Sequence, residues 1–410
     1  MKLFAGAVGA MVLAGLTITP VATAEPVREA CSAPAVGEDF QRRAPESMGV
    51  DPAALHDALA YASARLRFSI QVVRDNCLIG EGQYNQYSVD QQWQLFSATK
   101  GIVSLVAGAA WDQGKLDLDA PIGTYLPEGM GDEAHRAITV RQLLTQTSGL
   151  LESLPLEALT LGNDPSLPRQ AMSLPIVREP GTDFQYSQRA ADLVAYVVGQ
   201  AVGEDIQAFA QRELFGPIGI AEGSYNWSRD RSGNTYGYAH MFMQPKDFAK
   251  IGALLASAGV WNGQRVLSSE YITKLGESSP QNGCYSLLLW TNAGDTCVGP
   301  AFPIEEVVGH RMIPSAPADL FALNGAMHQN VFVMPNLGMS VTWTGLEASQ
   351  STSSNPANSE LYHEFFRILM RGVDDANVPD PGPFMPGPTL SRTPGDMFDL
   401  RVLESGIAPK

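Results

Sequence analysis

Residues 96–106 constrain this chain more than any other stretch, because Ser97 and Lys100 lie three residues apart at the start of an apolar segment. Apolar residues recur there at helical spacing: Ile102, Leu105, Val106 and Ala109. Gly114 follows, a residue type that commonly ends helices. Residues three apart share one face of a helix. The pattern therefore predicts a helix with Ser97 and Lys100 on the same face of its first turn.

This pairing has a chemical meaning. A serine hydroxyl is a poor nucleophile until a neighbouring base takes its proton. A lysine serves as that base when burial and neighbouring groups lower its pKa. The start of a helix also offers unpaired N–H groups and the positive end of the helix dipole, which suit a developing oxyanion. Ser-x-x-Lys is also common in ordinary solvent-exposed first turns, so the rest of the chain decides its meaning.

Composition narrows the class of protein. The chain has 410 residues, of which 45% are hydrophobic, enough for a large core. Its formal net charge of -16 argues against a nucleic-acid partner. We find no His-Glu-x-x-His, no closely spaced cysteine pair, no complete Walker A motif and no dinucleotide fingerprint, so the sequence predicts neither a metal nor a cofactor. It also lacks Gly-x-Ser-x-Gly, the nucleophile elbow of an α/β-hydrolase.

The first residues have the pattern of an export signal. Lys2 precedes an apolar run over residues 3–16, and Ala22-Thr23-Ala24 offers a small-x-small cleavage site. The sequence predicts a signal peptide over residues 1–24. The apolar run is too short for a stable membrane anchor. We therefore expect a secreted, periplasmic or cell-envelope protein.

Four cysteines are present, and an even number in an exported chain predicts disulfides. Four cysteines allow three connectivities. Cys284 and Cys297 bracket an expected strand and its return, so we pair them. Cys31 is then left with Cys77.

The order of elements predicts one domain built from both ends of the chain. We expect a helix over residues 51–64 and strands over 68–79 and 77–85. After the middle of the chain we expect helices over residues 245–257 and 360–370, and strands over 284–290, 320–324, 328–334 and 338–344. The prediction is an α+β fold whose antiparallel sheet is flanked by helices.

Residues 121–244 differ in texture, with short helical patterns, many turn residues and a long loop over residues 150–177. We expect a mainly helical lobe over 121–244, resting on a sheet domain formed by 25–120 and 245–373. The site would lie in the cleft where the two meet. The proline-rich tail, 374–410, is expected to be extended or poorly ordered.

Further motifs accompany Ser-x-x-Lys in a recognisable order. They are residues 97–101 (SATKG), 138–150 (ITVRQLLTQTSGL), 179–187 (EPGTDFQYS) and 260–263 (VWNG). The order resembles that of serine β-lactamases and penicillin-binding D,D-peptidases, and most closely that of class C β-lactamase-related serine hydrolases, over residues 45–370. The resemblance implies the β-lactamase/transpeptidase-like fold and an acyl-enzyme mechanism. It does not imply one substrate, because the fold serves several hydrolases.

The resemblance also implies roles for individual residues. Ser97 would be the nucleophile, and Lys100 the general base or its electrostatic helper. Tyr186 would shuttle the proton, with its phenolate favoured by the nearby lysine. The second motif usually ends in Asn, which positions a substrate amide in the lactamases. Gln188 stands there instead, and this weakens the β-lactam interpretation.

The third motif, Lys-Thr-Gly or His-x-Gly, is harder to place. Aligning residues 329–335 with the family's strand puts it at residues 326–328, with His328 in place of the usual glycine. The backbone N–H of Gln329 would then share the oxyanion with that of Ser97. His328 would narrow the pocket, bind a substrate carboxylate, or only pack.

The sequence thus predicts a secreted serine hydrolase acting through an acyl-enzyme on a small ester or amide. Two alternatives stay open. One is a D,D-carboxypeptidase or weak β-lactamase, with a peptide or β-lactam as partner. The other is a catalytically inactive binding or regulatory protein on the same fold.

Overall fold

The computed structural model describes residues 28–152, 162–302, 304–346 and 353–395, together with residues 1, 399 and 401. Apart from residue 1, the predicted signal peptide and its cleavage site lie outside the described residues, as does part of the loop expected over 150–177. In the described part of the chain, no helix is both long enough and apolar enough to cross a membrane.

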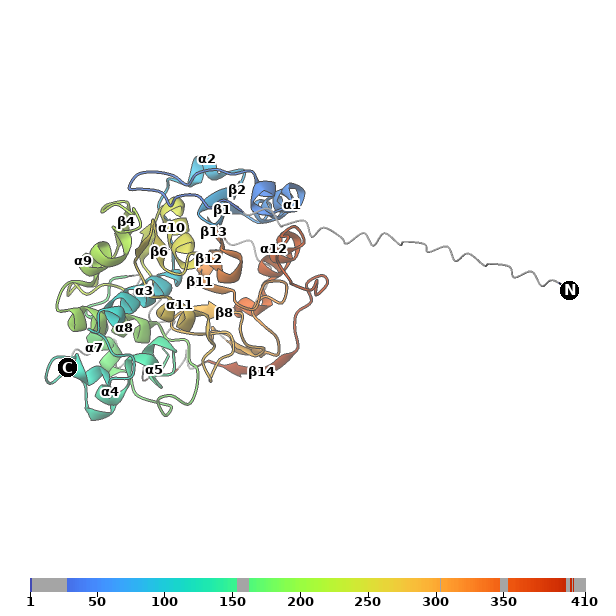
Figure 1. Cartoon of the computed structure of the whole chain (residues 1–410). Helices are drawn as coiled ribbons and strands as arrows, with labels where there is room; N and C mark the ends of the chain where they lie inside the picture. The colour runs from blue at the N-terminus through green and yellow to red at the C-terminus, as the bar shows by residue number, and fades with distance from the viewer. Residues whose placement is uncertain are drawn as a thin grey trace.

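A six-stranded sheet forms the centre of the molecule, in the order β2-β1-β13-β12-β11-β8 (Figure 1). Its strands are β1 (Arg67–Arg74), β2 (Cys77–Glu81), β8 (Trp290–Thr291), β11 (Phe321–Gly325), β12 (Gln329–Met334) and β13 (Met339–Gly345). The pairings are antiparallel. Because β1 pairs with β13, the two ends of the chain build one sheet, and the predicted α+β class is confirmed.

The first hairpin turns earlier than the sequence analysis expected. The first strand was predicted over residues 68–79, but β1 ends at Arg74. β2 begins at Cys77, where the second strand was predicted to start. Asp75 and Asn76 form the turn, with φ of 48° and 61°. Asp and Asn tolerate this left-handed conformation, which a two-residue hairpin turn requires. The prediction overlooked these two turn residues, which follow the β-branched residues of β1.

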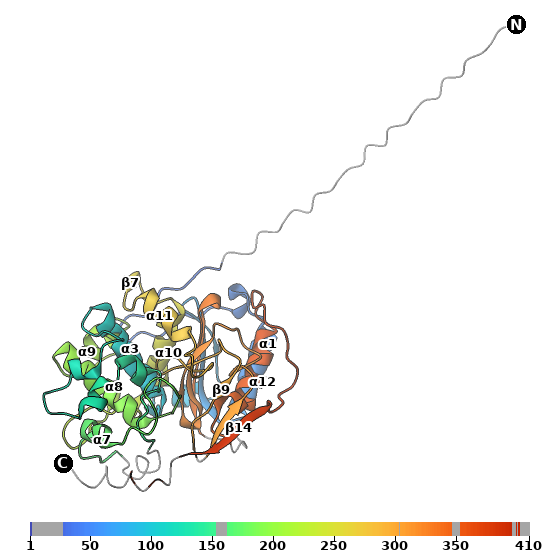
Figure 2. The same cartoon turned by 90° about the horizontal axis from the view of Figure 1, so that it is seen from below.

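Helices cover both faces of the sheet (Figure 2). On one face, α1 (Pro52–Ser63) packs against α12 (Glu360–Met370), and the aromatic side chains of α12 contact Phe332 and Trp343 of the sheet. On the other face, α10 (Pro245–Ala256) lies over the central strands and α3 (Ala98–Asp112) lies along β11. The sheet is therefore buried on both sides.

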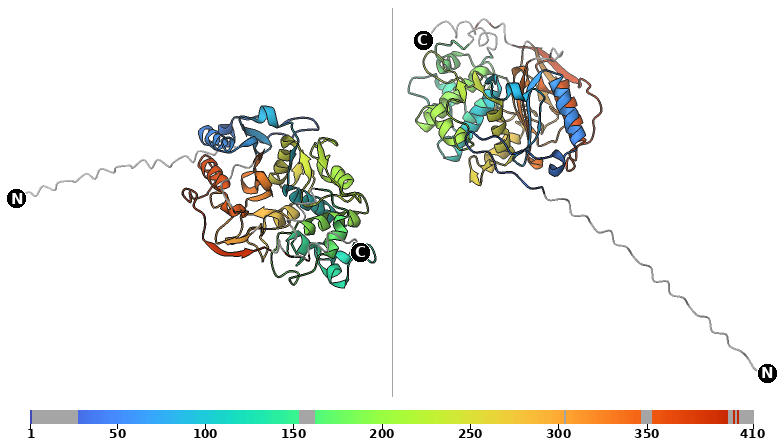
Figure 3. Two further views of the ribbon diagram at one scale, coloured as in Figure 1. Left: turned by 180° about the vertical axis from the view of Figure 1, so that it is seen from behind. Right: turned by 90° about the horizontal axis from the view of Figure 1, so that it is seen from above.

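The segment between α3 and α10 is mainly helical and covers the side of α3 that faces away from the sheet (Figures 2 and 3). In its described residues the helices are α4 (Glu133–Ala137), α5 (Val140–Leu144), α7 (Leu167–Ser173), α8 (Gln188–Val202), α9 (Ile206–Ala210) and a π-helical turn, η3 (Gln211–Phe215). One hydrophobic cluster joins this segment to α3, α10 and the sheet. The lobe predicted over 121–244 thus shares its core with the rest of the molecule.

Shorter elements complete the described chain. They are the helices α2 (Asn85–Ser88) and α11 (Ser269–Gly276), the 3-10 turns η1 (Pro45–Met48), η2 (Ile122–Thr124), η4 (Ala326–His328), η5 (Pro335–Leu337) and η6 (Pro356–Asn358), and the strands β3 (Trp93–Gln94), β4 (Tyr225–Trp227), β5 (Met241–Met243), β6 (Val260–Trp261) and β7 (Gln264–Arg265). The strand expected over 284–290 is only the two-residue β8.

The carboxy-terminal tail is partly a strand. β14 (Thr389–Pro394) pairs antiparallel with β10 (Ile304–Val308), whose other neighbour is β9 (Cys297–Val298) (Figure 2). Glu306 on β10 accepts hydrogen bonds from Thr389 Oγ1 at 3.1 Å and Arg392 Nη2 at 2.8 Å. The tail is extended here, as expected, but it is paired with the body of the protein rather than poorly ordered.

Candidate active site

The residue predicted to be the nucleophile lies where a short strand enters a buried helix. Leu95 donates its N–H to the Met241 carbonyl at 2.8 Å, which continues the pairing of β3 with β5. Phe96 follows with φ of 47°, an uncommon conformation for a bulky residue. Ser97 is the next residue and caps the amino terminus of α3. The chain thus turns sharply at Phe96. Ser97 stands at the start of the helix and is partly exposed.

Lys100 lies one turn into α3 and is 1% exposed. Its Nζ donates to Ser97 Oγ at 3.2 Å and to the Tyr238 carbonyl at 3.1 Å. It also donates to Oε1 of Gln188, the first residue of α8. Acceptors from three separate segments therefore hold the amine beside the Ser97 hydroxyl, as expected from the Ser-x-x-Lys spacing.

Tyr186 approaches the same point from the residue pair that precedes α8. Its ring centroid lies 4.6 Å from Lys100 Nζ and 6.0 Å from the ring of Trp290, on which it stacks. Burial raises the pKa of Tyr186 above its ordinary value, although a hydrogen bond with Ser97 acts in the opposite direction. The group is therefore a neutral phenol near pH 7. The phenolate expected from the sequence is not favoured here, because burial raises the pKa of Tyr186 more than the Ser97 hydrogen bond lowers it, and the charge of Glu152 raises that pKa further.

Residues 138–150 form hydrogen bonds with the backbone next to Tyr186. Thr139 and Gln142 form a capping box at the start of α5, as the Thr-x-x-Gln pattern predicts. Gln146 then accepts the N–H of Ser187 with its side chain and that of Gln185 with its carbonyl, the latter at 2.8 Å. These bonds fix the backbone on both sides of Tyr186.

The strand beside the nucleophile is β11, and it ends in a glycine that the sequence analysis did not single out. A Cβ atom on Gly325 would overlap the carbonyl of Leu95 and lie 3.1 Å from the Ala98 nitrogen. Only glycine allows the end of β11 to approach the Ser97 turn so closely. The available signal was a glycine at the end of the strand predicted over 320–324.

The positions of His328 and Gln329 differ from the expectation for the third motif. His328 lies in η4, three residues beyond Gly325, and its Nδ1 is 2.9 Å from the hydroxyl of Tyr362 on α12. Gln329 begins β12, and its side-chain amide donates to the Gly345 carbonyl at 2.7 Å. The alignment was displaced because the η4 turn adds residues between the glycine and the next strand. Of the three roles weighed for His328, this geometry matches packing.

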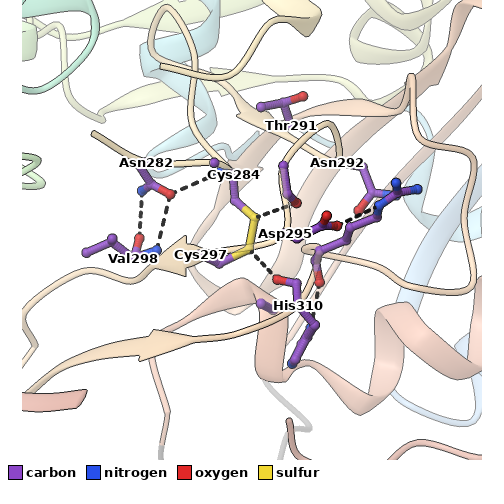
Figure 4. The surroundings of a disulfide bond; sticks show 12 residues. Asn282, Cys284, Thr291, Asn292, Asp295, Cys297, Val298 and His310 are labelled. Atoms are coloured by element: carbon purple, nitrogen blue, oxygen red, sulfur yellow. Dashed lines mark hydrogen bonds and ion pairs between the residues drawn. A yellow bond between two sulfur atoms is a disulfide. The ribbon is translucent and has the colours of Figure 1, made fainter. Parts of the chain in front are cut away.

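Both disulfides expected from the sequence are present. The Cα atoms of Cys31 and Cys77 are 5.1 Å apart, and those of Cys284 and Cys297 are 4.9 Å apart. Figure 4 shows the second pair, where Asn282 Oδ1 accepts the N–H groups of Cys284 and Val298.

The Cys284–Cys297 disulfide also adjoins the candidate site. Tyr285, the residue after Cys284, contacts the Tyr186 ring edge-on at 6.1 Å and the Trp290 ring at 5.0 Å. The bridge is thus one residue away from Tyr285, whose ring packs against those of Tyr186 and Trp290.

A family model described as beta-lactamase matches residues 56–349, well over half of the chain. The chain belongs to the beta-lactamase family. The match includes the Ser97 turn, the Tyr186 segment and the end of β11. The family and the fold predicted from the sequence are therefore confirmed.

Two curated relatives show how far the sequence similarity extends. Esterase EstB of Burkholderia gladioli is 31% identical over 150 residues, 32% of this chain and 38% of that protein. Monacolin J acid methylbutanoyltransferase of Aspergillus terreus is 30% identical over 174 residues, 37% of this chain and 41% of that protein. The chain thus aligns with about two fifths of the length of these relatives.

Solved structures extend the fold comparison over more of the chain. A putative beta-lactamase from Bacteroides dorei has a TM-score of 0.61 at 18% identity, covering 80% of this chain and 100% of that one. A putative 6-aminohexanoate-dimer hydrolase from Bacillus anthracis also has a TM-score of 0.61, at 16% identity, covering 84% and 89%. At these identities the likeness shows the fold.

Proposed function

We propose that this protein is a serine hydrolase that forms an acyl-enzyme on Ser97 with a small ester or amide substrate. The observation that carries the proposal is the 3.2 Å hydrogen-bond distance between the buried Lys100 amine and the Ser97 hydroxyl, with the phenol of Tyr186 hydrogen-bonded to the same hydroxyl. A nucleophile, a base and a proton donor converge there, which is what acyl transfer requires.

The proton path in this proposal follows from the neutral state of Tyr186. Lys100, in its neutral form, takes the proton of Ser97 as the oxygen attacks the substrate carbonyl. The Tyr186 phenol then gives its proton to the leaving group, and the lysine ammonium restores the phenol. Water reverses these transfers when it releases the acyl group.

The oxyanion would lie between the amino terminus of α3 and the end of β11. The Ser97 N–H is one proposed donor. We propose the Ala326 N–H as the other, in place of Gln329, because Gly325 brings this part of the backbone against the Ser97 turn. Two backbone donors aimed at the developing charge are the usual device for acyl transfer.

An ester is the substrate class that we favour. The names of relatives support it: Esterase EstB, and a lovastatin esterase of Penicillium rubens that is 28% identical over 172 residues. Gln188 occupies the position of the usual Asn, and its carbonyl oxygen is used by Lys100. Two disulfides also support an oxidising compartment, and we propose export through the signal peptide predicted over 1–24.

Active-site labelling tests the proposal. A fluorophosphonate probe should label the wild-type protein and fail to label Ser97→Ala. Ser104→Ala is the matched control, because Ser104 lies on the same helix but contacts Tyr271 instead of Lys100. A panel of p-nitrophenyl esters, nitrocefin and a D-Ala-D-Ala peptide then defines the substrate class.

Each rival has its own outcome. Labelling of Ser97 by a fluorescent penicillin together with release of D-Ala would favour a D,D-peptidase. Absence of labelling by either probe, in a folded protein, would leave the inactive binding protein. Ester hydrolysis at the wild-type rate by Ser97→Ala would place the chemistry elsewhere.

A further inference from the structure

We propose that Asp192 is a positioning residue for Lys100, which it orients through the backbone of Gly237 and Tyr238. This inference rests on the proposed function, because it concerns how the base of that reaction is held. Asp192 lies outside the sequence motifs that predicted the site. It would act on Lys100 through the backbone of the 237–238 segment.

The connection is a short series of hydrogen bonds. Asp192 Oδ1 accepts the N–H of Gly237 at 2.7 Å and the N–H of Tyr238 at 3.2 Å. The carbonyl of Tyr238 accepts the hydrogen bond from Lys100 Nζ at 3.1 Å. The carboxylate therefore fixes the peptide units on the amino side of the carbonyl that Lys100 uses.

Close packing makes this connection stiff. A Cβ atom on Gly237 would overlap the carbonyl of Ala191 on α8, so the segment lies directly against the helix backbone. Gln188 and Asp192 are four residues apart and share one face of α8. One helix thus sets two of the three acceptors of the lysine, Gln188 directly and Tyr238 through Asp192.

A buried ion pair holds the carboxylate in place. Arg189 donates from Nη1 to Asp192 Oδ2 and from Nη2 to Asp164 Oδ1, both at 2.7 Å. Both carboxylate side chains are 0% exposed, and that of Arg189 is 4% exposed. A buried carboxylate needs such partners, and with them it has one defined orientation. Asp192 is therefore oriented on both of its oxygens.

A purely structural role is the competing explanation, because breaking a buried ion pair destabilises any protein. The chain offers a matched control in α10. Asp247 pairs with Lys250 at 2.9 Å, also with i,i+3 spacing, and both side chains are 4% exposed. Lys250 donates to the Gly219 carbonyl, not to the Lys100 site. Asp247→Asn removes an equivalent charge without touching the proposed connection.

The test compares the rate of Ser97 labelling in Asp192→Asn, Asp247→Asn and the wild type, below the thermal midpoint of each. An amide at position 192 turns a donor toward either the backbone N–H groups or Arg189. It therefore breaks either the contacts to the segment or the ion pair that orients the side chain. We expect Asp192→Asn to slow labelling and kcat about 10-fold to 10²-fold, the usual effect of a misplaced supporting group, with KM little changed. Asp247→Asn should lower the thermal midpoint and keep the wild-type rate.

A second variant makes the test independent of charge. Gly237→Ala pushes the same segment away from α8 and should give the same slow labelling. Wild-type rates in Asp192→Asn or in Gly237→Ala, or equal slowing in Asp247→Asn, would overturn the proposal while Ser97 labelling in the wild type still supports the proposed function. A wild-type protein that is never labelled would instead remove the proposed function itself.

Discussion

At the scale of single residues, backbone geometry around Ser97 matters as much as side-chain chemistry. Phe96 has a positive φ, and Gly325 approaches its neighbours more closely than any other residue type allows. Strained or crowded backbone of this kind persists only where the surrounding structure enforces it, and it is concentrated at functional sites. Here Phe96 directly precedes Ser97, and Gly325 lies against the residues on either side of this turn.

Gly325→Ala tests the importance of this approach. The added methyl would overlap the Leu95 carbonyl, so we expect β11 to move away from the Ser97 turn. Labelling of Ser97 should fall by about 10²-fold or more, the usual cost of losing an oxyanion donor.

Gly199→Ala is the control for this substitution. Gly199 lies inside α8, where a Cβ would meet only ordinary contacts, the nearest at 3.5 Å. Alanine there should leave labelling unchanged and raise stability by about 0.5–1 kcal/mol. A Gly325→Ala protein that is labelled as fast as Gly199→Ala would show that β11 does not border the oxyanion site.

At the scale of elements, the two disulfides are expected to act differently. The cysteines of Cys31–Cys77 are 46 residues apart in sequence, and those of Cys284–Cys297 are 13 apart. On the chain-entropy estimate, the two bridges raise the free energy of unfolding by about 4 and about 3 kcal/mol. Only Cys284–Cys297 adjoins Tyr285 and the Tyr186 ring. Replacing both cysteines of that pair with serine should therefore slow labelling as well as lower the thermal midpoint.

The Cys31–Cys77 bridge provides the comparison. Its double serine variant should lose more stability and keep the labelling rate, because it ties the amino-terminal segment to β2 (Cys77–Glu81). Labelling kinetics and thermal melts of both variants decide this. Equal rates in the two variants would separate the Cys284–Cys297 bridge from the site.

The tail strand gives a second prediction at this scale. Truncation after Pro388 removes β14 and leaves Glu306 without Arg392 and Thr389. We expect the free energy of unfolding to fall by about 1–3 kcal/mol, because Glu306 keeps Ser353 and Asn358 as donors but its other oxygen loses Thr389 and Arg392. The open edge of β10 should also promote association. A chain ending at Gly395 keeps β14 and is the control. Equal melting of the two chains would contradict a stabilising role for β14.

At the scale of the whole molecule, buried tyrosines set the response to alkali. Burial raises the pKa of Tyr186, Tyr271 and Tyr285 above their ordinary value. The native protein keeps these protons, whereas the unfolded chain releases them near pH 10. The free energy of unfolding should therefore be unaffected by these groups below pH 10. Above it, the free energy should fall by about 1.4 kcal/mol per pH unit for each group.

Thermal melts across this range, with tyrosinate absorbance measured in parallel, check the prediction. The native protein should titrate fewer tyrosines near pH 10 than the denatured chain does. Full tyrosinate absorbance in a native protein at that pH, with an unchanged thermal midpoint, would contradict it.

Local patterns in the sequence determined the helices and the core of the site. Pro52 and Pro245 begin α1 and α10, and Thr139 with Gln142 caps α5. Ser97 and Lys100 meet because a helix turn places residues three apart on one face, whatever surrounds it. These features depend on contacts within a few residues, so spacing and residue type were sufficient to predict them.

Only the tertiary structure decided which distant segments meet the Ser97 turn. Gly325 and His328 are three residues apart, yet one borders Ala98 and the other Tyr362, because strand register and the η4 turn determine their faces. Burial by Trp290 and its neighbours determined that Tyr186 is a neutral phenol. Register and burial arise from partners far away in the chain, and no local pattern in the sequence specifies those partners.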